Sequence, residues 1–130
     1  MRLHIDVLGI LHLVWGAFGV MTGLSLGILA AGTRAAIGGD MFGMGERAAV
    51  ALLAIVGGGL VLGGGASVMT GWAIRRRAPR GRLAALALAI PNLVLVPFGT
   101  ALGVYTFWVL LNNDARRAFG RPPREAAPVV

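Results

Sequence analysis

Apolar residues fill three long stretches of this 130-residue chain, and charged residues gather in the segments between and after them. The stretches cover 7–31, 47–74 and 83–111. At 1.5 Å per residue, a helix over the first stretch is about 37 Å long, which exceeds the roughly 30 Å hydrocarbon core of a bilayer. The pattern therefore predicts an all-α chain whose helices cross a membrane.

The third stretch is interrupted by Pro91, Pro97 and Gly99, which predicts a helical hairpin that turns at 96–99. Its two arms, 83–96 and 98–112, are only about 21–23 Å long as helices. They either continue into flanking residues and span the membrane, or form a re-entrant hairpin that stops partway. The sequence leaves both alternatives open.

Arginine positions predict the orientation. Five of the twelve basic residues lie in 75–82, and four more follow the last apolar stretch, at Arg116, Arg117, Arg121 and Arg124. Cytoplasmic loops retain arginine, so a chain that crosses four times places both segments inside, together with Arg2. Both termini are then cytoplasmic. The first stretch is longer than the 7–15 apolar residues of a signal peptide, which favours a retained helix.

These points combine into one predicted architecture. Residues 1–119 form a single transmembrane domain, an integral membrane four-helix bundle made of two helical hairpins, 1–74 and 83–119. Residues 32–46 form a glycine-rich loop, and 120–130 form a disordered tail, because they contain proline and no apolar periodicity.

Small residues recur every fourth position in the predicted spans, and this spacing lets helix backbones approach closely. The simplest interpretation is that the first two spans pack against each other through two such stripes. The predicted packing positions are Gly19, Gly23, Gly27, Gly59, Gly63, Ser67, Gly71, Gly99 and Gly103.

Composition narrows the possible functions. The chain is 57% apolar and 13% charged, which is typical of a protein with lipid as its main solvent. It has no cysteine, and all five acidic residues lie outside the predicted spans. No Ser-His-Asp set, HExxH motif or phosphate-binding glycine loop is recognisable, so we expect no enzyme activity, no metal site and no cofactor. The arginines lack interleaved aromatic residues, which argues against a nucleic-acid partner.

Two polar residues lie inside the predicted spans, and each has two interpretations. His12 is either a proton relay or ligand, or a neutral imidazole bonded to a neighbouring helix. Asn92 either lines a pathway or bonds across helices. His4 is about 12 Å from His12 along a helix, too far to share a metal ion with it.

The loop arginines have a candidate role besides orientation. Guanidinium groups next to a membrane attract anionic lipid head groups. The predicted head-group and topology residues are Arg75, Arg76, Arg77, Arg80 and Arg82.

The run PFGTALGVYTFWVLL at 97–111, followed by DARRAF at 114–119, resembles the ending of a group of uncharacterised small four-helix bacterial membrane proteins. They share a P-x-G-T-x-L-G-x-Y-x-x-W-V-L-L last helix. The resemblance covers about the last 35 residues. It implies the turn, the fourth span and a bacterial inner membrane, and no activity or site.

The sequence thus favours a small non-enzymatic accessory or assembly subunit of a larger inner-membrane complex. Its partners are then the bilayer and either other membrane subunits or further copies of itself. The alternative is a homo-oligomeric channel or small-solute transporter with His12 or Asn92 on its pathway. A third hypothesis is a lipid-, quinone- or haem-binding module at Trp15 and His12.

Overall fold

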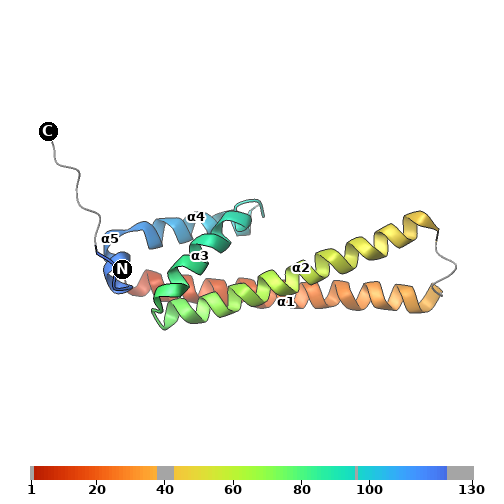
Figure 1. Cartoon of the computed structure of the whole chain (residues 1–130), viewed down its shortest axis with the longest axis horizontal. Coiled ribbons are helices and arrows are strands. Elements are labelled where there is room, and N and C mark those ends of the chain that lie inside the picture. Colours follow the sequence, from red (N-terminus) through yellow and green to blue (C-terminus); the bar gives the residue numbers. More distant parts are fainter. Residues whose placement is uncertain (1, 38–42, 96, 123–130) are drawn as a thin grey trace. The chain divides into compact units, whose positions relative to one another are not determined.

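The computed structural model describes residues 2–37, 43–95 and 97–122, and every regular element in them is a helix. The prediction of an all-α chain is confirmed. Val96 of the predicted turn, residues 38–42 of the predicted loop and residues 123–130 of the predicted tail lie outside the described residues. The helices, labelled in Figure 1, are α1 (Arg2–Ile37), α2 (Met44–Arg75), α3 (Pro79–Asn92), α4 (Phe98–Leu111) and α5 (Asn113–Ala118).

The chain divides into two compact units. One, which we call the hairpin unit, is Trp15–Ala66 and contains the C-terminal part of α1 and the N-terminal part of α2. The other, which we call the four-segment unit, is Met1–Val14 with Ser67–Val130. Its four long segments are the remaining parts of α1 and α2 together with α3 and α4, and it also contains the short α5.

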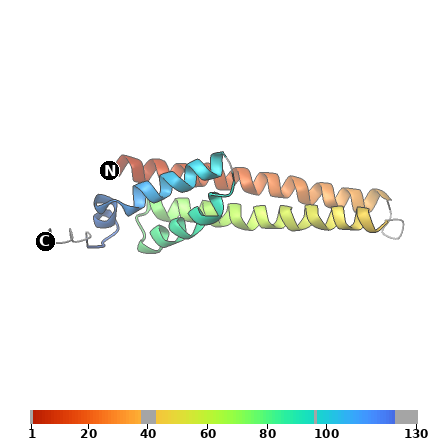
Figure 2. The ribbon, with the colours of Figure 1, turned by 90° about the horizontal axis from the view of Figure 1, so that it is seen from above.

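In the hairpin unit, α1 and α2 run antiparallel, as Figure 2 shows, and their backbones meet at glycines. A Cβ atom built on Gly23 would lie 2.5 Å from the carbonyl oxygen of Gly57, and one on Gly64 would lie 2.6 Å from that of Gly16. No side chain fits into such spaces, so the two backbones touch directly. All four glycines are buried.

The contacting glycines recur every seventh residue, at 16 and 23 in α1 and at 57 and 64 in α2. The same spacing continues in the four-segment unit, where a Cβ on Gly71 would lie 2.6 Å from the carbonyl oxygen of Gly9. A seven-residue repeat keeps one edge of a helix facing its partner over many turns. This repeat was missed at the level of sequence, where only the fourfold spacing was recognised.

The fourfold stripe predicted for α2 contributes only in part. Ser67 and Gly71 are buried, but Cβ atoms on Gly59 and Gly63 would meet no described atom within 4 Å. In α1, Gly23 lies in the contact and a Cβ on Gly19 would lie 3.4 Å from Gly64 Cα. A Cβ on Gly27 would meet no atom of the described residues within 4 Å. The contact surface of α2 therefore lies on Gly57 and Gly64.

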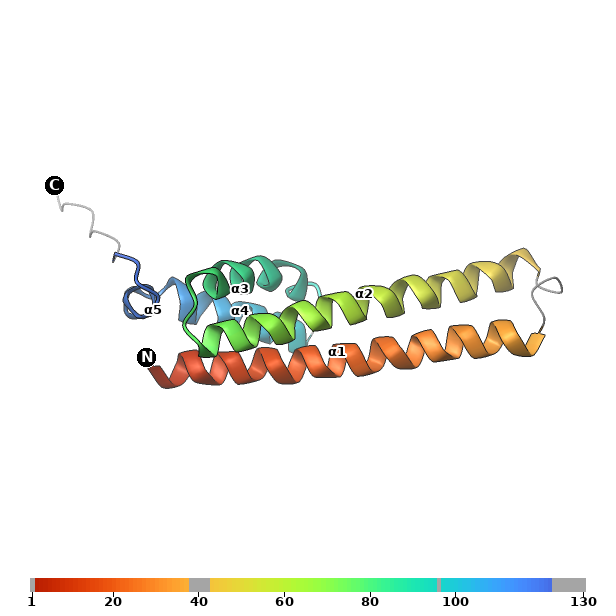
Figure 3. The ribbon, with the colours of Figure 1, turned by 60° about the horizontal axis from the view of Figure 1, so that its bottom comes forward.

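In the four-segment unit, α3 packs against α4, as Figure 3 shows. Gly103 permits this approach, because a Cβ there would lie 2.9 Å from the carbonyl oxygen of Ala89. Gly99 is equally enclosed, with the carbonyl oxygen of Asn92 at 2.6 Å from its built Cβ. The largest fully buried side chains include Ile5 and Leu8 from α1, Ile74 from α2, and Val109 and Leu110 from α4.

The predicted loop at 32–46 is shorter than expected, since α1 continues to Ile37 and α2 begins at Met44. Arg34 in the last turn of α1 complements the negative end of that helix. At the start of α2, the Glu46 carboxylate accepts a hydrogen bond of 2.6 Å from the Gly43 N–H. This is one of the two bonds of a capping box, and it helps to begin the helix without any apolar residue being required.

The predicted turn at 96–99 is also displaced. α3 ends at Asn92, one residue after Pro91, and α4 begins at Phe98, so Gly99 is helical. The Thr100 hydroxyl donates to the carbonyl of Leu93 at 2.7 Å, which ties the start of α4 to the end of α3. At the other end, Pro79 is the first residue of α3, a position that tolerates its missing N–H.

Helix α5 was not predicted. It begins where the Asn112 side chain accepts a hydrogen bond of 3.0 Å from the Asp114 N–H, a common N-terminal cap. Asp114 in its first turn and Arg116 and Arg117 in its last turn both complement the helix dipole. An asparagine followed by this charge order was the signal in the sequence.

Candidate functional site

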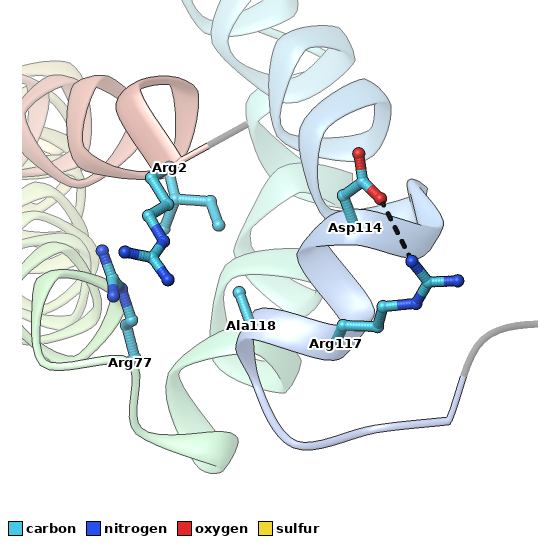
Figure 4. Close-up of a pocket in the computed structure, with 6 residues that line it drawn as sticks. Arg2, Arg77, Asp114, Arg117 and Ala118 are labelled. Carbon is cyan, nitrogen blue, oxygen red and sulfur yellow. Dashed lines mark ion pairs between the residues drawn. The ribbon is translucent and has the colours of Figure 1, made fainter.

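The four-segment unit contains a pocket of about 450 Å³ lined by charged side chains. Its wall is formed by Arg2 and Ile5 at the start of α1, Arg77 just after α2, and Asp114, Arg117 and Ala118 of α5 (Figure 4). Three arginines from three distant parts of the sequence thus line one pocket, together with a single acidic residue.

The charges of this pocket are not balanced. Asp114 lies 3.8 Å from Arg117, and this is the only ion pair among the six lining residues. In Figure 4 the guanidinium groups of Arg2 and Arg77 point toward each other, away from that pair. Because α1 begins at Arg2 and has no acidic residue in its first turn, its unsatisfied N–H groups add further positive potential here.

Arg77 has an unusual backbone. Its φ is 54°, in the left-handed region that costs an L-residue other than glycine roughly 1–2 kcal/mol. It ends α2 in a Schellman motif, in which Ala78 N–H donates to Ala73 O at 3.0 Å and Arg77 N–H donates to Ile74 O at 2.9 Å. Glycine is the usual residue at this position. The chain keeps an arginine there, with its side chain in the pocket wall.

The other four loop arginines lie in different surroundings. The Arg76 guanidinium stacks 3.6 Å from the centre of the Trp72 ring, and the Arg75 stem lies against Gly9. Arg80 is exposed. Arg82 is only 8% exposed, and its Nε donates to the carbonyl of Leu110 at 3.1 Å.

Of the five arginines predicted to meet lipid head groups, the structure therefore places Arg77 alone in the pocket wall. Arg2 and Arg117 also line the pocket. The sequence indicated only a role in orientation for these two residues. Arg82 is a structural residue, because Leu110 is in the last turn of α4, where carbonyl groups lack partners within the helix.

His12 and Asn92, the two predicted intramembrane polar residues, both lie in the four-segment unit and are 0% and 7% exposed. The His12 Nδ1 lies 3.1 Å from the carbonyl oxygen of Leu8, and its Nε2 has no hydrogen-bond partner in the described part of the chain. The carbonyl of Asn92, at the end of α3, accepts from Leu95 N–H at 3.0 Å.

An aromatic cluster joins α1 to α4 within the same unit. His4 Nδ1 lies 3.1 Å from the Tyr105 hydroxyl, and its ring packs edge-on against Trp108 at 5.5 Å between centres. Tyr105 and Trp108 stack on each other. This pairing of residues about a hundred positions apart gave no signal in the sequence.

Within residues 2–37, 43–95 and 97–122, no cluster of three or more His, Cys, Asp or Glu side chains could hold a metal ion. No protein-family model, curated protein or solved structure matches the chain. The site must therefore be interpreted from its own chemistry.

Proposed function

We propose that this protein is a small non-enzymatic integral membrane protein of the bacterial inner membrane, and an accessory or assembly subunit of a larger complex there. One observation carries the proposal. Two helices are long and apolar enough to cross a membrane, yet in their most apolar 18-residue windows only 28% of α1 and 11% of α2 is buried. A core helix of a water-soluble protein would be mostly buried.

The exposed surface of α2 illustrates the point. Leu52, Ile55 and Leu62 are 62%, 72% and 77% exposed. Exposing apolar surface to water costs about 25 cal/mol per Å², so many such side chains require lipid or another protein around them. The open face at Gly59 and Gly63 supports the docking of a further helix, because small residues allow close backbone approach.

The pocket supports the proposed orientation. It brings together Arg2, Arg77 of the basic loop and Arg117 of the C-terminal segment. Arg82 near the start of α3 also bonds to Leu110 near the end of α4. A topology with both termini in the cytoplasm requires the N-terminus, the basic loop and the C-terminal segment to lie on the same side of the membrane. The common pocket agrees with this requirement. Helices α3 and α4, of 14 residues each, either span or form a re-entrant hairpin in this proposal.

We expect reporter fusions to give opposite readings at two positions. A green fluorescent protein fused after Val130 should fluoresce, and alkaline phosphatase fused there should be inactive, because the C-terminus is cytoplasmic. Alkaline phosphatase fused after Gly43, between α1 and α2, should be active. An active phosphatase after Val130 would refute the four-crossing topology.

The subunit proposal is tested by extracting the protein from its own membranes in mild detergent and measuring the native mass with everything that accompanies it. Co-purification with a larger membrane complex is the expected result. Resistance to alkaline carbonate extraction is a prior requirement, and release into the soluble fraction would rule out an integral membrane protein.

A homo-oligomeric channel or transporter is the second candidate, favoured by the buried, unpartnered Nε2 of His12. It requires ion or solute flux in liposomes that changes in His12→Ala or Asn92→Ala. The burial of both side chains within one chain instead favours a packing role. A purified protein that runs alone as a defined oligomer and carries flux would reverse this order.

A further inference from the structure

We propose that Arg2 and Arg77 bind a phosphate group in the pocket that Asp114 and Arg117 also line. The charge of this pocket favours an anion. Asp114 pairs with Arg117, which leaves Arg2 and Arg77 as two converging cations with no acidic partner among the lining residues (Figure 4). Two guanidinium groups repel each other. An anion bound between them is attracted to both, and these two attractions offset the repulsion.

The geometry of the donors in this pocket suits a phosphate group. A guanidinium group presents N–H donors in a planar fork that matches two oxygens of a phosphate, and these charge-assisted bonds are stronger than neutral ones. The pocket also lies at the start of α1, where free backbone N–H groups favour an anion. A single-atom anion would leave most of these N–H donors without an acceptor. A tetrahedral oxyanion has several oxygens, which can accept hydrogen bonds from donors on different sides of the pocket.

The backbone of Arg77 also favours a role for its side chain. Its left-handed conformation would suit glycine better, so the arginine is held there at a cost to the fold. Residues held in such conformations cluster at active sites and ligand sites. Here the strained turn directs Arg77 into the pocket that Arg2 enters from α1.

The phosphate can come from a lipid head group or from a soluble phosphate compound. The lipid source rests on the proposed function, because only a membrane protein has its helix ends at the head-group level. Phosphate binding itself does not depend on it. Failure of the carbonate test would therefore leave this proposal standing, and failure of binding would leave the membrane assignment standing.

The experiment uses the full chain in mild detergent, with binding measured by calorimetry. The probes are dioctanoyl phosphatidic acid, zwitterionic dioctanoyl phosphatidylcholine and inorganic phosphate. We expect saturable binding of at least one anionic probe. In Arg77→Gly the Kd of that probe should rise about tenfold or more, through loss of one charge-assisted contact. Arg2→Gln should give a similar loss.

The matched control is Arg80→Gln, which removes one charge from the same basic segment, 75–82, at a residue that does not line the pocket. Its Kd should change less than twofold. Because glycine suits the backbone of residue 77, Arg77→Gly should also unfold at an equal or higher temperature, so lost binding cannot be attributed to misfolding.

Each outcome decides the matter. Binding of inorganic phosphate with the same dependence on Arg77 supports the site and assigns a soluble phosphate. Binding of phosphatidic acid alone supports it and assigns a head group. Equal loss in Arg77→Gly and Arg80→Gln, equal affinity for the zwitterionic lipid, or no saturable binding would overturn the proposal.

Discussion

Gly64→Leu is expected to destabilise the chain by about 3 kcal/mol, the upper end of the cost of overpacking. Even a Cβ atom at Gly64 would lie 2.6 Å from the carbonyl oxygen of Gly16 and 2.7 Å from the backbone nitrogen of Val20. These are backbone atoms, which cannot move aside as a flexible side chain can. The two helices must separate, and dispersion contacts along both are lost.

The control for this change is the neighbouring residue. Gly63→Leu adds the same side chain to the same helix, but a Cβ there meets no described atom within 4 Å. Its effect on stability in detergent should be close to zero. Titration with sodium dodecyl sulfate, followed by tryptophan fluorescence, measures both variants. Equal midpoints for the two would contradict the seven-residue packing.

Arg82→Ala is expected to cost about 1.5–3 kcal/mol, the usual worth of a hydrogen bond to a charged group. Arg82 is 8% exposed and donates to the Leu110 carbonyl from Nε, so its removal leaves a buried acceptor and an unfilled volume. Arg82→Lys should restore little of this stability, because lysine has no donor at the Nε position and no planar fork.

Arg80→Ala provides the comparison, since Arg80 is exposed in the same helical turn. Its midpoint in the same titration should shift by less than a quarter of the shift in Arg82→Ala. Similar shifts would mean that the loop needs only its total charge, and that the contact with Leu110 adds nothing.

The helical class and the two long apolar segments could be predicted because they depend on composition and length alone. The choice among glycines could not. Gly63 and Gly64 are adjacent, and a fourfold pattern through Gly59, Gly63 and Gly71 is as regular as the sevenfold one through Gly57 and Gly64. Which one a helix uses depends on the position of its partner, and only the structure places Gly16 opposite Gly64.

The roles of the individual arginines also could not be predicted from the sequence. Their sign and their position at the ends of apolar segments were enough to predict an orientation. Their individual roles depend on contacts across the fold, such as that between Arg82 and Leu110, twenty-eight residues apart. The pairing of Arg2 with Arg77 in one pocket has no local sequence signal at all.

The helix ends were predictable in part. The caps at Gly43–Glu46 and at Asn112–Asp114 are written in the sequence, and they account for the early start of α2 and the presence of α5. The apolar pattern does not predict these caps, because the capping groups are polar.

The sevenfold glycine contact in the hairpin unit restricts how this gene can change length. In each of its two pairs, Gly16 with Gly64 and Gly23 with Gly57, the two residue numbers add up to the same total, so one common register serves both pairs. Inserting one codon between 57 and 64 would turn one of these glycines about 100° away from its partner. Codons added between α1 and α2 would disturb neither pair. Among descendants of this sequence, insertions and deletions should therefore accumulate in that connection. Between the paired glycines, a change in length should be a multiple of seven residues and should occur equally in α1 and α2.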